Sequence, residues 1–267
     1  MFGSRSEAGQ FGRSIFAWLG LVLMIASFGW WQIVSVPEKS GPTNVAAKSP
    51  FNLVVLDPGH GGQDSGAICG GILEKDLTLD IAQRVDRLLQ TQGVATVLTR
   101  IGDSYVSLAD RAALANRTRG CILVSIHFNE GNKNVSTGVE TYYAERQLTA
   151  AKPVLAWLPF LQRPAIELPN VESQSLAGFI QDAVVTRTQS VNRGTKAQQF
   201  FVIANVQVPA VLVEGGFLSN KDEMAKLING DYRERLAAAI AEGILQYRDV
   251  MKQRQEAVPA GTPEAPE

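Results

Sequence analysis

Apolar residues in this chain form short uninterrupted runs that alternate with longer segments of helical period. Residues 52–57 make a first run that predicts a buried strand, and a glycine-rich turn follows it. Residues 76–90 carry Leu77, Ile81 and Val85 on one helical face. By the same criteria we predict strands over 94–98, 122–127, 139–144, 200–203 and 210–213, and helices over 106–118, 173–188 and 232–251. Strands that alternate with helices of this length indicate βαβ units, and therefore an α/β fold with a mostly parallel sheet.

Three segments depart from this alternation. Residues 37–50 are rich in proline, glycine, serine and threonine, which is typical of an exposed linker. Residues 145–171 contain four prolines, which exclude a long helix, but Trp157 and Phe160 make the segment too apolar for a free linker. We expect an ordered excursion there that packs on the domain and borders a functional cleft. Residues 253–267 are polar and proline-containing, and they predict a disordered tail.

The N-terminal region contains an apolar segment, residues 14–36, without any charged side chain. At roughly 1.5 Å per residue, a helix of this length crosses a bilayer core of about 30 Å. A cleaved signal peptide has a shorter apolar core of about 7–15 residues and a small-residue cleavage site. We therefore favour an uncleaved signal anchor over a signal peptide. Arg5 and Arg13 favour a cytoplasmic N-terminus over residues 1–13 and a folded body outside the membrane.

The composition fits one globular domain, which we expect over residues 51–252. Hydrophobic residues make up 45% of the chain and charged residues 19%, enough to bury a sizeable core. The formal net charge of −1 argues against a broad surface for nucleic acid. Cys69 and Cys121 are too few for a disulfide framework or a cysteine-rich metal site. A single bridge between them stays open, and two buried free thiols are the favoured interpretation.

The chain has two histidines, His60 and His127, and each follows a strand-like run. In a parallel α/β sheet, ligands bind at the carboxyl ends of the strands, so both histidines indicate a site. The turn that carries His60 is not a dinucleotide loop, because the pattern Gly-x-Gly-x-x-Gly would require glycine where Asp64 stands. No Gly-Lys-Ser/Thr sequence supports a phosphate loop either. Taken alone, the turn has a second interpretation, a tight turn with an incidental histidine.

Two glutamates extend this pair of histidines. Glu74 opens the helix that follows the turn, where the helix N-terminus favours a negative charge. Together with His60 and His127 it makes a set of two imidazoles and one carboxylate, which is the ligand set of a catalytic zinc with an open fourth position. Glu214 ends an apolar strand, where a carboxylate is unfavourable unless it is paired or used. Beside a zinc-bound water, Glu214 would act as general base and then as proton donor.

Six sequence motifs occur in order between about Leu53 and Tyr247. They are Leu56-Asp-Pro-Gly-His-Gly-Gly62, Glu74-Lys-Asp-Leu-Thr-Leu79, Leu108-Ala-Asp-Arg-Ala-Ala-Leu-Ala-Asn116, Ser125-Ile-His-Phe-Asn129, Gly138-Val-Glu-Thr-Tyr-Tyr143 and Val213-Glu-Gly-Gly-Phe-Leu-Ser-Asn220. In these motifs the chain resembles the zinc-dependent N-acetylmuramoyl-L-alanine amidases of bacterial cell walls, the third amidase family. The resemblance covers the expected domain and leaves out the N-terminal apolar segment and the tail.

The resemblance implies a Zn²⁺ ion held by His60, Glu74 and His127, with Glu214 as the catalytic carboxylate. It implies hydrolysis of the amide between N-acetylmuramic acid and L-alanine of the peptidoglycan stem peptide. The implied fold is a twisted, mostly parallel sheet flanked by helices on both faces. Two other interpretations stay open, a non-catalytic wall-binding module and a zinc hydrolase of another cell-wall amide. A module that only binds has no need of Glu214.

Four further polar residues of the motifs are left outside the catalytic set. We expect structural roles for Arg111 and Asn116, because an arginine on a helix is usually solvated or ion-paired. Contact with substrate stays open for Asn129 and Asn220, but asparagines in turns and at strand ends more often bond their own backbone, and we expect this role for both.

The expected partners follow from the same resemblance and from the apolar segment. Peptidoglycan is the expected substrate, and no wall-binding repeat is recognisable in the chain. The expected location is the cell envelope on the periplasmic side, held to the inner membrane by residues 14–36. In some relatives an inserted helix covers the zinc until a partner protein withdraws it. Residues 145–171 therefore leave the need for a protein activator open.

Overall fold

The computed structural model of the 267-residue chain describes residue 24 and residues 51–131, 135–147 and 170–257. The chain divides into two units, Met1–Ala46 and Ala47–Glu267, and the second unit contains the α/β domain. The predictions for residues 1–13, 14–36 and 37–50, and most of those for 145–171, lie outside the described residues. Within the described part, no helix has the length and apolar character needed to span a membrane.

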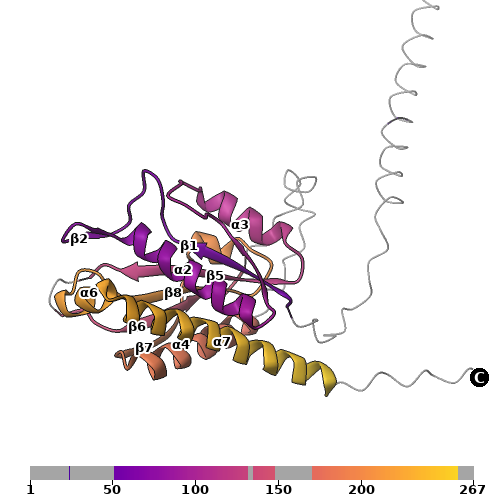
Figure 1. Ribbon diagram of the computed structural model, residues 1–267. Helices are drawn as coiled ribbons and strands as arrows, with labels where there is room; N and C mark the ends of the chain where they lie inside the picture. The colour runs from indigo at the N-terminus through magenta and orange to yellow at the C-terminus, as the bar shows by residue number, and fades with distance from the viewer. Residues whose placement is uncertain (1–23, 25–50, 132–134, 148–169, 258–267) are drawn as a thin grey trace, which may run out of the picture. The chain divides into compact units, whose positions relative to one another are not determined.

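Six strands form the central sheet, in the order β4-β1-β5-β8-β6-β7 (Figure 1). Their bounds are β1 Leu53–Pro58, β4 Ala95–Leu98, β5 Cys121–Asn129, β6 Val139–Tyr143, β7 Asn192–Ala197 and β8 Ala210–Phe217. The first four strands in this order are parallel, β6 is antiparallel to β8, and β7 is parallel to β6. The predicted mostly parallel sheet is therefore confirmed. A separate two-stranded hairpin, β2 (Ile68–Cys69) with β3 (Ile72–Leu73), follows the turn after β1.

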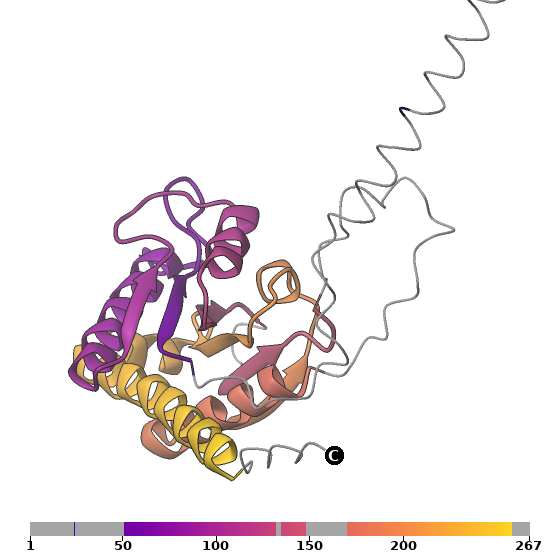
Figure 2. The same cartoon turned by 90° about the vertical axis from the view of Figure 1, so that its right-hand side faces the viewer.

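Helices cover both faces of this sheet (Figure 2). Their bounds are α2 Glu74–Thr91, α3 Leu108–Arg117, α4 Val171–Thr188, α5 Phe201–Ala204, α6 Lys221–Ile228 and α7 Gly230–Glu256. Helices α2, α4 and α7 pack over one face and enclose the larger apolar core. Helices α3 and α5 cover the other face over a smaller core. We call these the α2/α4/α7 face and the α3/α5 face. This arrangement confirms the expected α/β fold with helices on both sides.

The central strands β1, β5 and β8 are largely apolar because they are buried on both faces. In β1, for example, Val54 contributes to the larger core and Val55 to the smaller core. In β5, Leu123 lies in the smaller core, and side chains two and four positions later share its face. His127 therefore emerges on the α3/α5 face. Glu214 on β8 is the register partner of His127 on the neighbouring parallel strand, so its side chain emerges on the same face.

One of the predicted elements is wrong. Residues 200–203 were expected to be a strand, but the apolar run Phe201–Ala204 forms the short helix α5. Four apolar residues fit either element, and periodicity cannot separate them. The strand in this region is β7, whose sequence is polar because it lies at the edge of the sheet.

The C-terminal region and the cysteines differ from the predictions in smaller ways. Helix α7 continues to Glu256, so residues 253–256 are helical, whereas the tail beyond residue 257 lies outside the described part. Both cysteines are free. Cys121 is buried as expected, and burial raises the pKa of its thiol to about 11. Cys69 is only half-buried, because it lies in the two-residue strand β2 outside the main sheet.

The contact between α4 and α7 depends on Gly243. A Cβ atom at this position would lie 2.5 Å from Ile180 Cα and 2.7 Å from the carbonyl oxygen of Phe179, both backbone atoms of α4. We expect Gly243→Ala to force the helices apart and to lower the free energy of unfolding by about 1–3 kcal/mol. Gly178→Ala on α4 is the matched control, because its Cβ would meet no atom within 4 Å. This control should stabilise the protein by up to about 1 kcal/mol through helix propensity, measured by urea unfolding.

Candidate metal centre

The turn after β1 holds His60 in an unfavourable backbone conformation. The φ angles of His60, Gly61 and Gly62 are 60°, 126° and 59°. Glycine adopts such angles freely, but a residue with a Cβ atom loses roughly 1–2 kcal/mol in the left-handed region. The surroundings must therefore hold the turn in place, and strain of this kind is typical of functional sites.

Arg111 is one of the groups that hold the turn. Its guanidinium donates hydrogen bonds to the carbonyl oxygens of Pro58 at 2.8 Å and His60 at 2.6 Å, and to Asp57 Oδ1 at 2.6 Å. Only 3% of Arg111 is exposed, and Asp57 is fully buried. The expected structural role is borne out as a buried ion pair rather than a solvated side chain. Arg111 thus fixes the backbone of the strained histidine directly.

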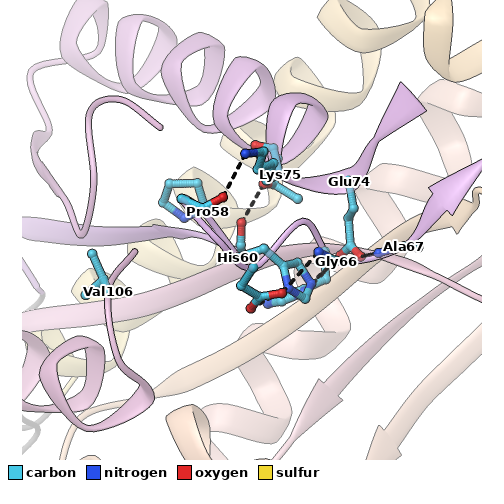
Figure 3. A network of polar contacts seen from close by, with 12 residues as sticks. Pro58, His60, Gly66, Ala67, Glu74, Lys75 and Val106 are labelled. Carbon is cyan, nitrogen blue, oxygen red and sulfur yellow. Dashed lines mark hydrogen bonds and ion pairs between the residues drawn. The ribbon is translucent and has the colours of Figure 1, made fainter. Parts of the chain in front are cut away.

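Arg100 and Lys75 complete this support. Arg100 is buried and donates to the carbonyl oxygens of Pro58 at 3.0 Å and Gly59 at 2.8 Å. Lys75 donates to the carbonyl oxygen of Gly62 at 2.8 Å. It also pairs with the carboxylate of Asp103, in the loop between β4 and α3, at 2.7 Å. Figure 3 shows Lys75 above this turn. Three cationic side chains therefore bind the carbonyl groups of four residues of this turn, Pro58, Gly59, His60 and Gly62. The sequence did not indicate this role for Lys75 or Arg100.

The side chains of His60, Glu74 and His127 converge, as the sequence predicted. Glu74 Oε1 lies 3.0 Å from His60 Nε2 and 3.1 Å from His127 Nδ1. One ligand atom from each residue lies within 4.8 Å of the others, a spacing that can hold one metal ion. Each residue comes from a different element: His60 from the turn after β1, Glu74 from the first position of α2, and His127 from β5. His127 lies within β5 rather than just beyond it, because the strand runs on to Asn129.

Outer contacts orient the three side chains. His60 Nδ1 lies 2.9 Å from Asp64 Oδ2, which turns Nε2 toward Glu74. Glu74 is 3% exposed, and its two oxygens accept backbone hydrogen bonds from Phe128 at 3.0 Å and Ala67 at 2.9 Å (Figure 3). Burial alone would raise the pKa of Glu74, but hydrogen bonds with both histidines outweigh it and lower that pKa. Glu74 is therefore ionised, as a metal ligand must be.

Glu214 lies beside this cluster with an unsatisfied oxygen. Its Oε2 atom is buried and has no hydrogen-bond partner within the described part of the chain. Burial raises the pKa of Glu214 well above its ordinary value, and the nearby carboxylates of Glu74 and Glu140 raise it further. A buried carboxyl group without a partner is costly, which indicates that this oxygen serves a function.

Glu140 is a second carboxylate of the site that reading the sequence did not single out, although it lies in one of the six motifs. It is the register partner of Glu214 on the antiparallel strand β6, so both side chains lie on the α3/α5 face. Asn129 donates to Glu140 Oε1 at 2.6 Å, so the expectation that Asn129 bonds its own backbone is wrong. Asn220 does bond the backbone, since its side chain caps α6. Asn116 has the expected structural role, bonding backbone groups that follow α5.

Gly66 makes the close approach of His60 and Glu74 possible. Its φ angle is 63°, and a Cβ atom there would lie 2.5 Å from both Glu74 Oε2 and His60 Cδ2. We expect Gly66→Ala to displace these side chains and to weaken binding of a divalent metal at least tenfold, measured by competition with a chromogenic chelator. Gly102→Ala is the matched control, because its Cβ would meet nothing within 4 Å. Unchanged metal affinity in Gly66→Ala would contradict a role of these side chains as ligands.

The α/β domain carries His60, His127, Glu74 and Glu214 near the carboxyl ends of its central strands β1, β5 and β8. These are residues of the kind that a hydrolytic enzyme uses. A family model described as N-acetylmuramoyl-L-alanine amidase matches residues 54–246, and the chain belongs to this family. It is thus an enzyme of the N-acetylmuramoyl-L-alanine amidase kind, as the six motifs indicated.

Known relatives agree with this membership. Over 217 residues the chain is 34% identical to the N-acetylmuramoyl-L-alanine amidase LytC of Bacillus subtilis (strain 168), a match that covers 80% of this chain and 40% of LytC. The crystal structure of N-acetylmuramoyl-L-alanine amidase from Clostridium difficile 630 superposes with a TM-score of 0.63 at 36% identity, covering 75% of this chain and 98% of that one. The CwlD amidase from Clostridioides difficile, solved in complex with the GerS lipoprotein, gives a TM-score of 0.64 at 27% identity and covers 74% of this chain and 99% of that one.

Proposed function

We propose that this protein hydrolyses the amide between N-acetylmuramic acid and L-alanine of the peptidoglycan stem peptide, with zinc as cofactor. The observation that carries the proposal is the convergence of His60, Glu74 and His127 on one point. The buried, unpaired oxygen of Glu214 beside them supplies the acid–base group that hydrolysis requires.

The three proposed ligands suit zinc. Two imidazole nitrogens and one carboxylate oxygen leave a fourth tetrahedral position open, as in catalytic zinc sites. The contact between Asp64 and His60 Nδ1 is of the type that orients histidine ligands of metals and increases their basicity. Neither cysteine belongs to the converging group, since Cys121 is buried in the smaller core and Cys69 packs against the larger core.

When bound, a zinc ion would polarise the amide carbonyl and lower the pKa of its water to about 7. Glu214 accepts a proton from the attacking water and transfers it to the nitrogen of the leaving L-alanine. The unpaired Oε2 atom is free for this exchange. Burial raises the pKa of Glu214, Glu74 and Glu140 raise it further, and the positive charge of a metal held at Glu74 would act in the opposite direction.

We also propose the placement of the chain in the cell envelope. Residues 1–13 lie in the cytoplasm, residues 14–36 form an uncleaved membrane anchor, and residues 37–50 link the anchor to the domain at 51–252 on the periplasmic side. The uncharged stretch 14–36 and the arginines before it support this arrangement. Retention of the protein in membranes after alkaline washing tests the anchor. A protein activator is compatible with the proposal, since the CwlD amidase was solved in complex with a lipoprotein.

The enzymatic proposal is tested with the purified full chain and isolated peptidoglycan. We expect released peptides with a free N-terminal L-alanine, identified by mass spectrometry, and no release after treatment with a chelator. Activity should return when zinc is added. Release of acetate in place of stem peptides would identify another cell-wall amide as the substrate. Binding to peptidoglycan without any product would identify a wall-binding module.

A further inference from the structure

A buried carboxylate beside Glu214 is surrounded by four hydrogen-bond donors. Glu140 Oε1 accepts from Asn129 Nδ2 at 2.6 Å and from the hydroxyl of Tyr142 at 2.7 Å. Glu140 Oε2 accepts from Arg193 Nε at 2.8 Å and from Lys196 Nζ. The Glu140 side chain is 2% exposed, so its charge requires at least one cation nearby.

The number of cations exceeds what this carboxylate needs. Within the described part of the chain, Glu140 is the one carboxylate paired with Arg193 or with Lys196. Two positive charges against one negative charge leave an excess of one. The surface network of α2 and α7 is balanced by comparison, since it contains two arginines and two carboxylates, Arg84 and Arg233 with Asp80 and Glu234. The excess charge at Glu140 is therefore available to a ligand.

Both cations reach the surface. The side chain of Arg193 is 35% exposed and that of Lys196 is 40% exposed, whereas the carboxylate between them is buried. Aromatic rings support them from the side of the protein. The guanidinium carbon of Arg193 lies 4.9 Å from the ring centre of Phe217, and Lys196 Nζ lies 5.8 Å from that of Tyr142. Anchored in this way, the two groups would lose little conformational entropy when they bind a carboxylate.

The position of this pair relative to the proposed reaction centre is set by strand register. Glu140 and Glu214 are direct partners on β6 and β8, and Tyr142 pairs with Lys196 on β7. The two cations therefore flank the proposed base on the side of the edge strand. A ligand carboxylate held by the two cations would therefore lie close to Glu214.

From these contacts we propose that Arg193 and Lys196 form a subsite for a carboxylate of the stem peptide adjacent to the scissile amide. The inference rests on the proposed function, because it names part of that substrate. A carboxylate accepts charge-assisted hydrogen bonds from a guanidinium and an ammonium group, whereas a carboxamide is neutral and offers only one weaker acceptor. The enzyme should therefore prefer an acidic stem peptide over an amidated one.

The test compares N-acetylmuramoyl-L-alanyl-D-glutamate with the same compound in which both carboxyl groups are carboxamides. For the full chain loaded with zinc, we expect about a tenfold higher kcat/KM on the acid. Lys196→Met should remove most of this preference through a higher KM for the acid, with a clearly smaller loss of kcat/KM on the diamide than on the acid. Lys196→Arg should restore the preference. Arg187→Gln, an exposed arginine paired with Glu242, is the matched control and should preserve the preference.

Two outcomes would overturn the subsite. One is equal cleavage of acid and diamide by the unaltered chain. The other is an equal loss on both compounds in Lys196→Met, which would mean that Lys196 only stabilises Glu140. Binding of both compounds to the zinc-loaded Glu214→Gln protein, measured by calorimetry, separates this question from catalysis. If the unaltered chain cleaved neither compound, the proposed function would fail, and the binding preference would still decide the subsite.

Discussion

Replacement of Glu214 by glutamine is expected to lower kcat for release of stem peptides about 10³-fold, within the range that general acid–base catalysis contributes. Glutamine has nearly the same shape but cannot accept a proton from the attacking water. Oε2 of Glu214 is buried and has no partner within the described part of the chain, so no neighbouring group that we observe would take over its role. KM should change little, because the substitution affects proton transfer more than binding. Rates are measured by chromatography of the released peptides.

Zinc content separates this effect from loss of the metal. The Glu214→Gln protein should bind one zinc ion as tightly as the unaltered chain, because Glu214 is not among the three converging ligand residues. Glu256→Gln, an exposed glutamate at the end of α7, is the matched control and should leave kcat unchanged. Full activity of Glu214→Gln would refute the assigned mechanism.

The second large effect is expected for Glu74→Ala. This substitution removes the carboxylate between the two histidines. Zinc affinity should fall more than about 100-fold, because removal of a residue that only hydrogen-bonds to a ligand already weakens metal binding by about 10–100-fold. The backbone N–H groups of Ala67 and Phe128 also lose their acceptor. One buried and one partly buried donor without a partner should lower the free energy of unfolding of the metal-free protein by about 2–4 kcal/mol. Competition with a chelator and urea unfolding measure the two losses.

A graded series makes this expectation specific. Asp64→Asn should weaken zinc binding by about 10–100-fold, since Asp64 orients His60 without belonging to the converging set. Asp76→Ala, at an exposed position in the same first turn of α2, is the control and should leave zinc affinity unchanged. If Glu74→Ala bound zinc as tightly as Asp76→Ala, Glu74 would not be a ligand.

The sequence alone predicted most of the fold, because the helices and central strands bury continuous apolar patterns. Prediction from the sequence failed where the apolar pattern is absent or short. The edge strand β7 is polar and contains Gly194, and it forms only because β6 offers a partner. The four-residue run at Phe201 fits a strand and a helix equally well, and contacts with the rest of the domain decide between them.

The sequence by itself also determined the candidate site residues, since two scarce histidines and two glutamates occur at the ends of predicted elements. Only the tertiary structure decided what surrounds them. The cations that hold the turn of His60 and the pair at Glu140 lie 13 to 56 positions away in the chain from the groups that they bind. Such contacts depend on strand order and register, which apolar periodicity does not encode. The structure therefore supplies the supports of the strained histidine and the charge excess beside Glu214, whereas the sequence supplied the reactive groups themselves.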